Sequence, residues 1–205
     1  ESRGETHLTV EGTGDTTFVQ ASYPFPSATD PDFFPLSVLD SLLSGASSLN
    51  MFGGGISNKT SRLYKALVEP ELTVGMSGDA QATLDPYLYN IVMVIHPERE
   101  PDEALAALDT EILRIQEEKV SEKEVARAVK QAKALFAYGS ESITNQAFWM
   151  GYTEIFANYE WFETYIDNLA AVSPDDVQRV AKKYFQKKSR VVGTYLPVNE
   201  ENSND

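Results

Sequence analysis

Apolar and polar residues alternate in two short stretches near the start of the chain. Residues 6–11 (THLTVE) and residues 16–23 (TTFVQASY) have the two-residue period of a β-strand. The sequence GTGD lies between them and is typical of a turn. We therefore expect two strands that form a hairpin or lie next to each other in a sheet.

The pattern then becomes helical before it returns to strands. Leucines recur at helical spacing in residues 33–43. A second helix is expected at residues 60–68, because Pro70 cannot continue it. Two more strands are expected at residues 72–80 and 87–96. The second of these, YLYNIVMVIH, is apolar enough to occupy the centre of a sheet.

The second half of the chain predicts several helices and one last strand. Ser121 and Glu124 are three residues apart in the pattern of a capping box, which starts a helix. Ser173, Pro174 and Asp176 are typical of the start of the last helix. The periodicity places the helices at residues 101–118, from 121, at 144–157, at 161–171 and from 173 to about 185, and the strand at 190–196.

This order of elements predicts an α+β fold. We expect a two-layer sandwich in which helices cover a mostly antiparallel sheet of about five or six strands. No linker or internal repeat divides the chain. We therefore expect one domain at residues 1–198 and a disordered acidic tail at residues 199–205.

Composition excludes several classes of protein. The net charge of -14 disfavours binding to nucleic acid or to anionic lipid. The absence of cysteine excludes disulfides, thiolate zinc sites and cysteine nucleophiles. No apolar run is long enough to span a membrane, and the first ten residues do not resemble a signal peptide. The chain starts at Glu1 rather than Met, which favours a processed protein or a piece of a longer one; we expect bacterial cytoplasm or periplasm.

The glycine-rich stretch GGGISNKT resembles a phosphate-binding P-loop except at one position. Gly53, Lys59 and Thr60 fit the motif, but Asn58 stands where it requires glycine. A P-loop also follows a strand, whereas this stretch follows the predicted helix LSVLDSLL. Nucleotide binding is therefore disfavoured. In the simplest alternative, the glycines only let the chain reverse direction.

The residues around these glycines resemble a known family. In LDSLLSG…GGG…SRLYKALVE, the family pattern S-R-L-Y-x-x-L is matched by Ser61, Arg62, Leu63, Tyr64 and Leu67. The sequence resembles the C-terminal, inactive type of domain in the pitrilysin/insulinase-like (inverzincin) zinc metallopeptidases. Mitochondrial processing peptidase and the cytochrome bc1 core proteins are in the same family. The resemblance extends from the opening strands to the late SPDDVQRVAKKYF helix.

The resemblance also shows which chemistry this chain lacks. Family catalysis requires a zinc-binding H-x-x-E-H motif, but this sequence has only His7 and His96, and neither lies in such a motif. The family's inactive half supplies an Arg and a Tyr to the substrate, and the matching positions here are Val68 and either Val74 or Gly75. We therefore predict no catalytic residue, no metal ligand and no cofactor in this chain, with zinc held by a partner domain.

The resemblance implies a non-catalytic half of a peptidase. It would pair with a zinc-bearing homologous domain, in cis or in trans, and enclose a peptide substrate. The residues expected to bind that peptide are in the glycine-rich loop: Gly53, Gly54, Gly55, Ser57 and Asn58. An exposed strand edge could also add an extended peptide to the sheet. The alternatives are a scaffold subunit without a protease role and a loop that only shapes the fold. The aromatic residues of 148–165 are expected in the core, with a hydrophobic surface for a partner as the alternative.

Overall fold

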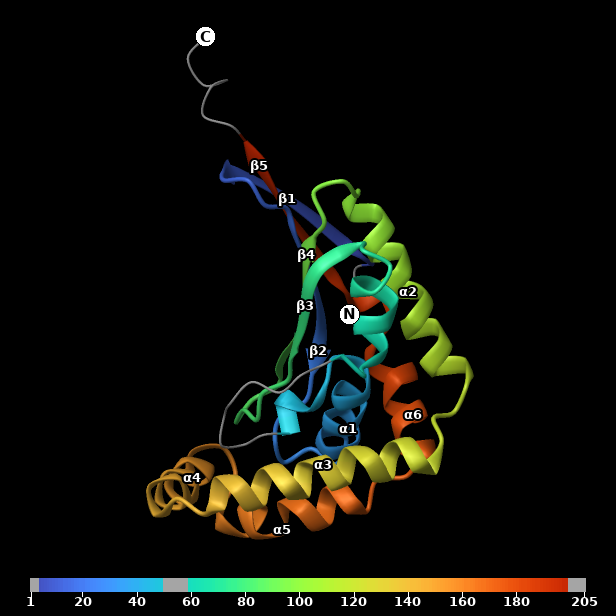
Figure 1. The fold of residues 1–205 in the computed structure, drawn as a ribbon. Helices are drawn as coiled ribbons and strands as arrows, with labels where there is room; N and C mark the ends of the chain where they lie inside the picture. The colour runs from blue at the N-terminus through green and yellow to red at the C-terminus, as the bar shows by residue number, and fades with distance from the viewer. Residues whose placement is uncertain (1–3, 50–58, 199–205) are drawn as a thin grey trace.

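The computed structural model describes residues 4–49 and 59–198 and shows one five-stranded sheet with helices on one of its faces (Figure 1). The strand order is β1-β5-β2-β4-β3, with β1 parallel to β5 and every other neighbouring pair antiparallel. The strands are β1 (Thr6–Thr13), β2 (Phe18–Phe25), β3 (Thr73–Asp79), β4 (Tyr87–Ile95) and β5 (Val191–Val198). The expected α+β sandwich is confirmed.

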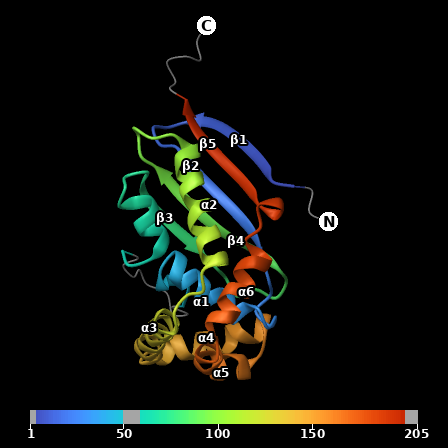
Figure 2. The same ribbon diagram turned by 90° about the vertical axis from the view of Figure 1, so that its right-hand side faces the viewer.

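Helices form the second layer and extend it beyond the end of the sheet. Helices α1, α2 and α6 lie against the sheet, whereas α3, α4 and α5 pack together at one end of the molecule (Figures 1 and 2). The α-helices are α1 (Phe33–Leu43), α2 (Pro101–Glu117), α3 (Glu122–Ser140), α4 (Ile143–Phe156), α5 (Tyr159–Ala170) and α6 (Pro174–Tyr184). The short turns are the 3-10 helices η1 (Ala46–Leu49) and η3 (Lys187–Ser189) and the π-helical η2 (Tyr64–Val68).

The first two strands do not pair, so the expected hairpin is wrong. Strand β5 lies between them and pairs with β1 from Thr6↔Val191 to Thr13↔Val198. It also pairs with β2, where Val192 is opposite Ala21 and both side chains are buried against the helices. Alternation identifies a strand and its buried face, but it does not identify the neighbouring strand.

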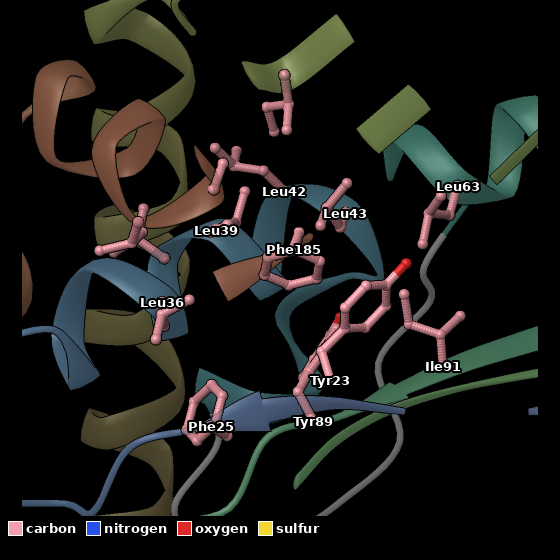
Figure 3. Close-up of a cluster of buried hydrophobic side chains, with 14 of the residues drawn as sticks. Tyr23, Phe25, Leu36, Leu39, Leu42, Leu43, Leu63, Tyr89, Ile91 and Phe185 are labelled. Atoms are coloured by element: carbon pink, nitrogen blue, oxygen red, sulfur yellow. The ribbon is translucent and has the colours of Figure 1, made fainter. Parts of the chain in front are cut away.

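Helix α1 lies at the centre of the core and is buried almost all round. A helix that is apolar on all sides needs neighbours on all sides. It packs between the sheet and the other helices, close to Tyr23, Phe25 and Ile91 of the central strands (Figure 3). The core residues labelled in Figure 3 are Tyr23, Phe25, Leu36, Leu39, Leu42, Leu43, Leu63, Tyr89, Ile91 and Phe185.

A buried polar group joins α1 to the sheet. The Tyr89 hydroxyl donates to Asp40 Oδ1 at 2.5 Å, and Ser44 Oγ donates to the same oxygen. Burial, followed by the Asp40 charge, raises the pKa of Tyr89 well above its usual value. A Cβ atom on Gly78 of β3 would come within 2.6 Å of Asp40 Oδ1, so this strand position requires glycine.

The helix expected at residues 60–68 is present at residues 62–68, but its last five residues are the π-helical η2, in which the Glu69 N–H donates to the Tyr64 carbonyl, five residues back, at 3.1 Å. One further expectation needs correction. The aromatic residues of 148–165 are not all in the core. Trp161 and Tyr165 of α5 are buried, but Phe148 of α4 is 58% exposed, because α4 packs only one side against its neighbours.

Candidate functional site

The residues predicted to bind substrate lie outside the described part of the chain: Gly53, Gly54, Gly55, Ser57 and Asn58. Their role stays a prediction, as does the disordered tail at residues 199–205, which lies outside it as well. The elements that lead toward the glycines are α1 and η1 rather than a strand. This order differs from the strand, loop and helix of a P-loop.

The motif that follows the glycines is part of the core. Leu63 and Leu67 are fully buried, and Ser61 Oγ accepts from the Tyr64 N–H at 3.3 Å. Arg62 ties this segment to two helices, because it donates to Glu111 of α2 at 3.1 Å and to Glu124 of α3 at 2.8 Å. Residues Ser61 to Leu67 therefore have a structural role, because they connect this segment to the core and to helices α2 and α3.

Valine or glycine occupies the positions where the family resemblance leads us to expect Arg and Tyr. Val68 is the last residue of η2 and packs against the core. Val74 is on the edge strand β3 beside a β-bulge, and its side chain is 56% exposed. Neither valine nor the neighbouring Gly75 can donate a side-chain hydrogen bond to a substrate carbonyl. These positions therefore carry no side chain that could perform the role of such a pair in catalysis.

The two histidines do not form a metal site. His7 is on the edge strand β1, with Nε2 3.5 Å from Glu5 Oε1. His96 directly follows β4, and its Nδ1 accepts from the Glu98 N–H at 3.3 Å. Within residues 4–49 and 59–198, no group of three or more His, Asp or Glu side chains could hold a metal ion. The described residues therefore do not fit the zinc of the family.

The most distinctive surface is the face of the sheet that no helix among the described residues covers (Figure 1). Because successive strand residues point to opposite faces, the residues that alternate with the core positions lie on it. Several are apolar and exposed, and Leu8 and Val10 of β1 are 56% and 59% exposed. We call this surface the uncovered face; its main apolar members are Leu8, Val10, Phe18, Leu88, Val92, Val94, Val191 and Tyr195.

A shallow hollow of about 560 Å³ lies in the uncovered face. Gly193 of β5 forms part of it, with Leu8 opposite on β1 and Gln20 opposite on β2. A Cβ atom on Gly193 would meet nothing within 4 Å, so the missing side chain leaves space that another surface could fill. Tyr195 borders the hollow and donates from its hydroxyl to the Thr13 carbonyl at 2.8 Å.

A small hydrogen-bonded group lies beside the hollow on the same face. Ser22 Oγ donates to Asn90 Oδ1 at 2.7 Å, and the Gln20 amide donates to that oxygen at 3.2 Å. These bonds join β2 to β4 and satisfy side chains that would otherwise need water. The face therefore combines apolar residues of β1, β4 and β5 with a polar group at Gln20, Ser22 and Asn90.

The sequence carried a signal for this face that the sequence interpretation did not use. In β4, Ile91 and Met93 point into the core, but Val92 and Val94 on the opposite side are apolar as well. A strand that is apolar on both sides is typical of a sheet covered on both faces. The helices that the structure describes cover one of these faces.

Comparisons with known proteins agree with this architecture. The structure is similar to a protease from Helicobacter pylori (16% identity, TM-score 0.84, 96% of this chain and 45% of that one). It is also similar to the inactive peptidase domain from Bordetella parapertussis (25% identity, TM-score 0.78, 93% and 96%). A chain of Complex III2 from Candida albicans shares the fold (14% identity, TM-score 0.73, 93% and 45%). No curated protein sequence matches the chain.

The fold defines a domain of the peptidase type, and the described residues offer no group of side chains that could hold a metal ion. The sequence profile described as the peptidase M16 inactive domain matches residues 2–132, which is more than half of the chain. The chain belongs to this family. It spans 45% of the Helicobacter protease but 96% of the Bordetella domain, so it corresponds to one inactive half.

Proposed function

We propose that this chain is the non-catalytic half of a two-part zinc metallopeptidase and that its uncovered face packs against the zinc-bearing half. The observation that carries the proposal is the apolar composition of this face, above all in β1 and β4. Exposed contiguous apolar surface on a folded domain is typical of a binding site. A homologous domain, on the same polypeptide or on another chain, is the expected partner.

In this proposal the two halves enclose the peptide, and all zinc chemistry belongs to the partner. This half contributes containment and recognition. The glycine-rich residues from Gly53 to Asn58 would contact the peptide, and the edge strand β3 could pair with an extended segment through backbone hydrogen bonds. Val68 and Val74 support a role without direct participation in the reaction, because they cannot stabilise developing charge.

The test pairs the natural zinc-bearing half with this one and measures both binding and peptide cleavage. Leu8→Ser with Val10→Ser should weaken the complex by about tenfold or more, because large apolar contacts at an interface are lost. Leu84→Ser with Leu113→Ser is the matched control, since these exposed leucines lie outside the uncovered face. Unchanged affinity in the β1 variant would refute the proposed interface.

The alternative is a scaffold subunit that pairs in the same way without serving a protease. The same experiment separates the two. A peptidase half gains cleavage activity when this chain is added, and loses that gain with the β1 variant. A scaffold binds with equal affinity but leaves cleavage unchanged.

A further inference from the structure

The exposed side of α4 carries a stripe of large apolar side chains that no described element covers. Phe148, Tyr152 and Ile155 occur at i, i+4 and i+7, so they lie along one side of the helix. Their side chains are 58%, 40% and 65% exposed. The rings of Phe148 and Tyr152 stack with centroids 5.4 Å apart and an angle of 14° between their planes. We call these three residues the α4 stripe.

The α4 stripe is not needed to attach α4 to the domain. Another side of the helix does this, where Thr153 and Phe156 are buried and the Phe156 ring contacts Trp161 at 5.2 Å. The stripe is therefore apolar surface in excess of what the fold requires. Its spacing is the one with which a helix presents anchors to a second helix.

The charge around the stripe restricts what could cover it. Residues 134–178, which include all of α4 and α5, contain seven acidic residues and no Lys, Arg or His. Two of these carboxylates are next to the end of α4. Glu154 accepts from the Tyr159 N–H at 2.6 Å, and a hydrogen bond to Glu163 raises the pKa of Tyr159. A second copy of this chain would bring the same negative charge, so a basic partner is favoured.

We propose that the α4 stripe docks a basic amphipathic helix of a protein partner. Apolar residues of that helix would lie along Phe148, Tyr152 and Ile155. Its Lys or Arg side chains would reach the carboxylates of Glu154 and Glu163 or lie over the exposed rings. The α4 stripe shares no residue with the uncovered face, and α4 lies at the opposite end of the molecule from the C-terminal ends of β1 and β5 (Figure 1). Its test does not depend on the proposed function.

The probe is a fluorescent amphipathic model helix of about 18 residues made of Leu and Lys, with a twin in which Glu replaces Lys. The Lys peptide should bind the purified protein at least about tenfold more tightly than the Glu peptide. Amide chemical shifts should change along α4 and the start of α5. Binding of both peptides with equal affinity, or shifts confined to other elements, would overturn the proposal.

Variants separate a specific site from general attraction to an acidic protein. Phe148→Ala with Ile155→Ala should weaken the Lys peptide about tenfold, whereas Leu84→Ala with Leu113→Ala should leave its affinity unchanged.

Glu154→Gln with Glu163→Gln should weaken binding of the Lys peptide about threefold or more. Glu98→Gln with Glu117→Gln removes equal charge elsewhere and should leave the affinity unchanged. The proposal is wrong if the α4 variants and their controls behave alike. All the altered side chains are exposed, and circular dichroism checks that each variant is folded.

Discussion

Arg190, the residue directly before β5, donates from Nη1 to Oδ1 of Asp109 on α2 at 2.5 Å, and this contact connects the sheet to the helix layer. The Arg190 side chain is only 1% exposed, and it also donates to Glu5 and, at 3.1 Å, to the Tyr23 hydroxyl. Burial would lower the pKa of Arg190, but the hydrogen bonds to Asp109 and Glu5 and the interaction with Tyr23 keep it above its usual value. One buried cation therefore joins β2 and α2 to the residues that directly precede β1 and β5.

Removing this cation should destabilise the fold. We expect Arg190→Met to lower the free energy of unfolding by about 2–3 kcal/mol, because Asp109, Glu5 and Tyr23 lose a shared donor, while Asp109 keeps its ion pair with Lys187 at 2.6 Å. Urea unfolding followed by circular dichroism measures the change. Lys182→Met removes an equal charge from an exposed position and should change stability by less than about 0.5 kcal/mol. An Arg190 variant as stable as this control would show that the cluster contributes little.

Asp32 at the start of α1 should make stability depend on pH in the acid range. Its carboxylate accepts from Arg179 at 2.5 Å, from Lys183 at 2.6 Å and from Tyr184 at 3.0 Å. Burial acts to raise the pKa of Asp32, but these hydrogen bonds outweigh it and hold the pKa below the ordinary 3.8. The folded state therefore binds fewer protons than the unfolded state, so this contribution is full above pH 3.8 and is lost as the pH falls below it.

The variant Asp32→Asn tests this dependence. It should lower the free energy of unfolding at pH 7 by about 1–2 kcal/mol, a reduced value because the Arg179 and Lys183 side chains are half exposed. It should also flatten the fall in stability below pH 4. Asp167→Asn, at an exposed position of α5, is the control. A curve for Asp32→Asn that runs parallel to the wild type from pH 7 to pH 2 would contradict the assignment.

Gly193 offers a test of the uncovered face that does not remove any contact. Gly193→Val should keep or raise stability by up to about 1 kcal/mol, because the new side chain enters open space and valine favours a strand. It should nevertheless weaken binding to the zinc-bearing half, since the valine fills the hollow that we propose the partner occupies. Thermal unfolding and affinity are measured on the same sample. Full binding by a stable Gly193→Val protein would place the partner elsewhere.

Local sequence signals predicted most elements of the fold. The boxes at Ser121 and Ser173 do cap α3 and α6, because each serine hydroxyl and the acidic side chain three residues later satisfy nearby backbone groups. The leucine spacing of α1 and the apolar run of β4 were also sufficient to predict these two elements, since propensity and periodicity act within a few residues. The family resemblance agreed with the matching profile and with the fold.

The sequence by itself determined which segments are strands and helices, which helix ends are capped, and that only two histidines and no cysteine are available to bind metal. The tertiary structure alone decided that β5 lies between β1 and β2 and that the stripe on α4 is exposed while Trp161 is buried. It also decided that the described helices all lie on one face of the sheet. The physical reason is the sequence separation over which each kind of interaction acts. Capping and periodicity depend on neighbours along the chain, whereas strand order and exposure depend on which surfaces meet after residues far apart in sequence have packed together.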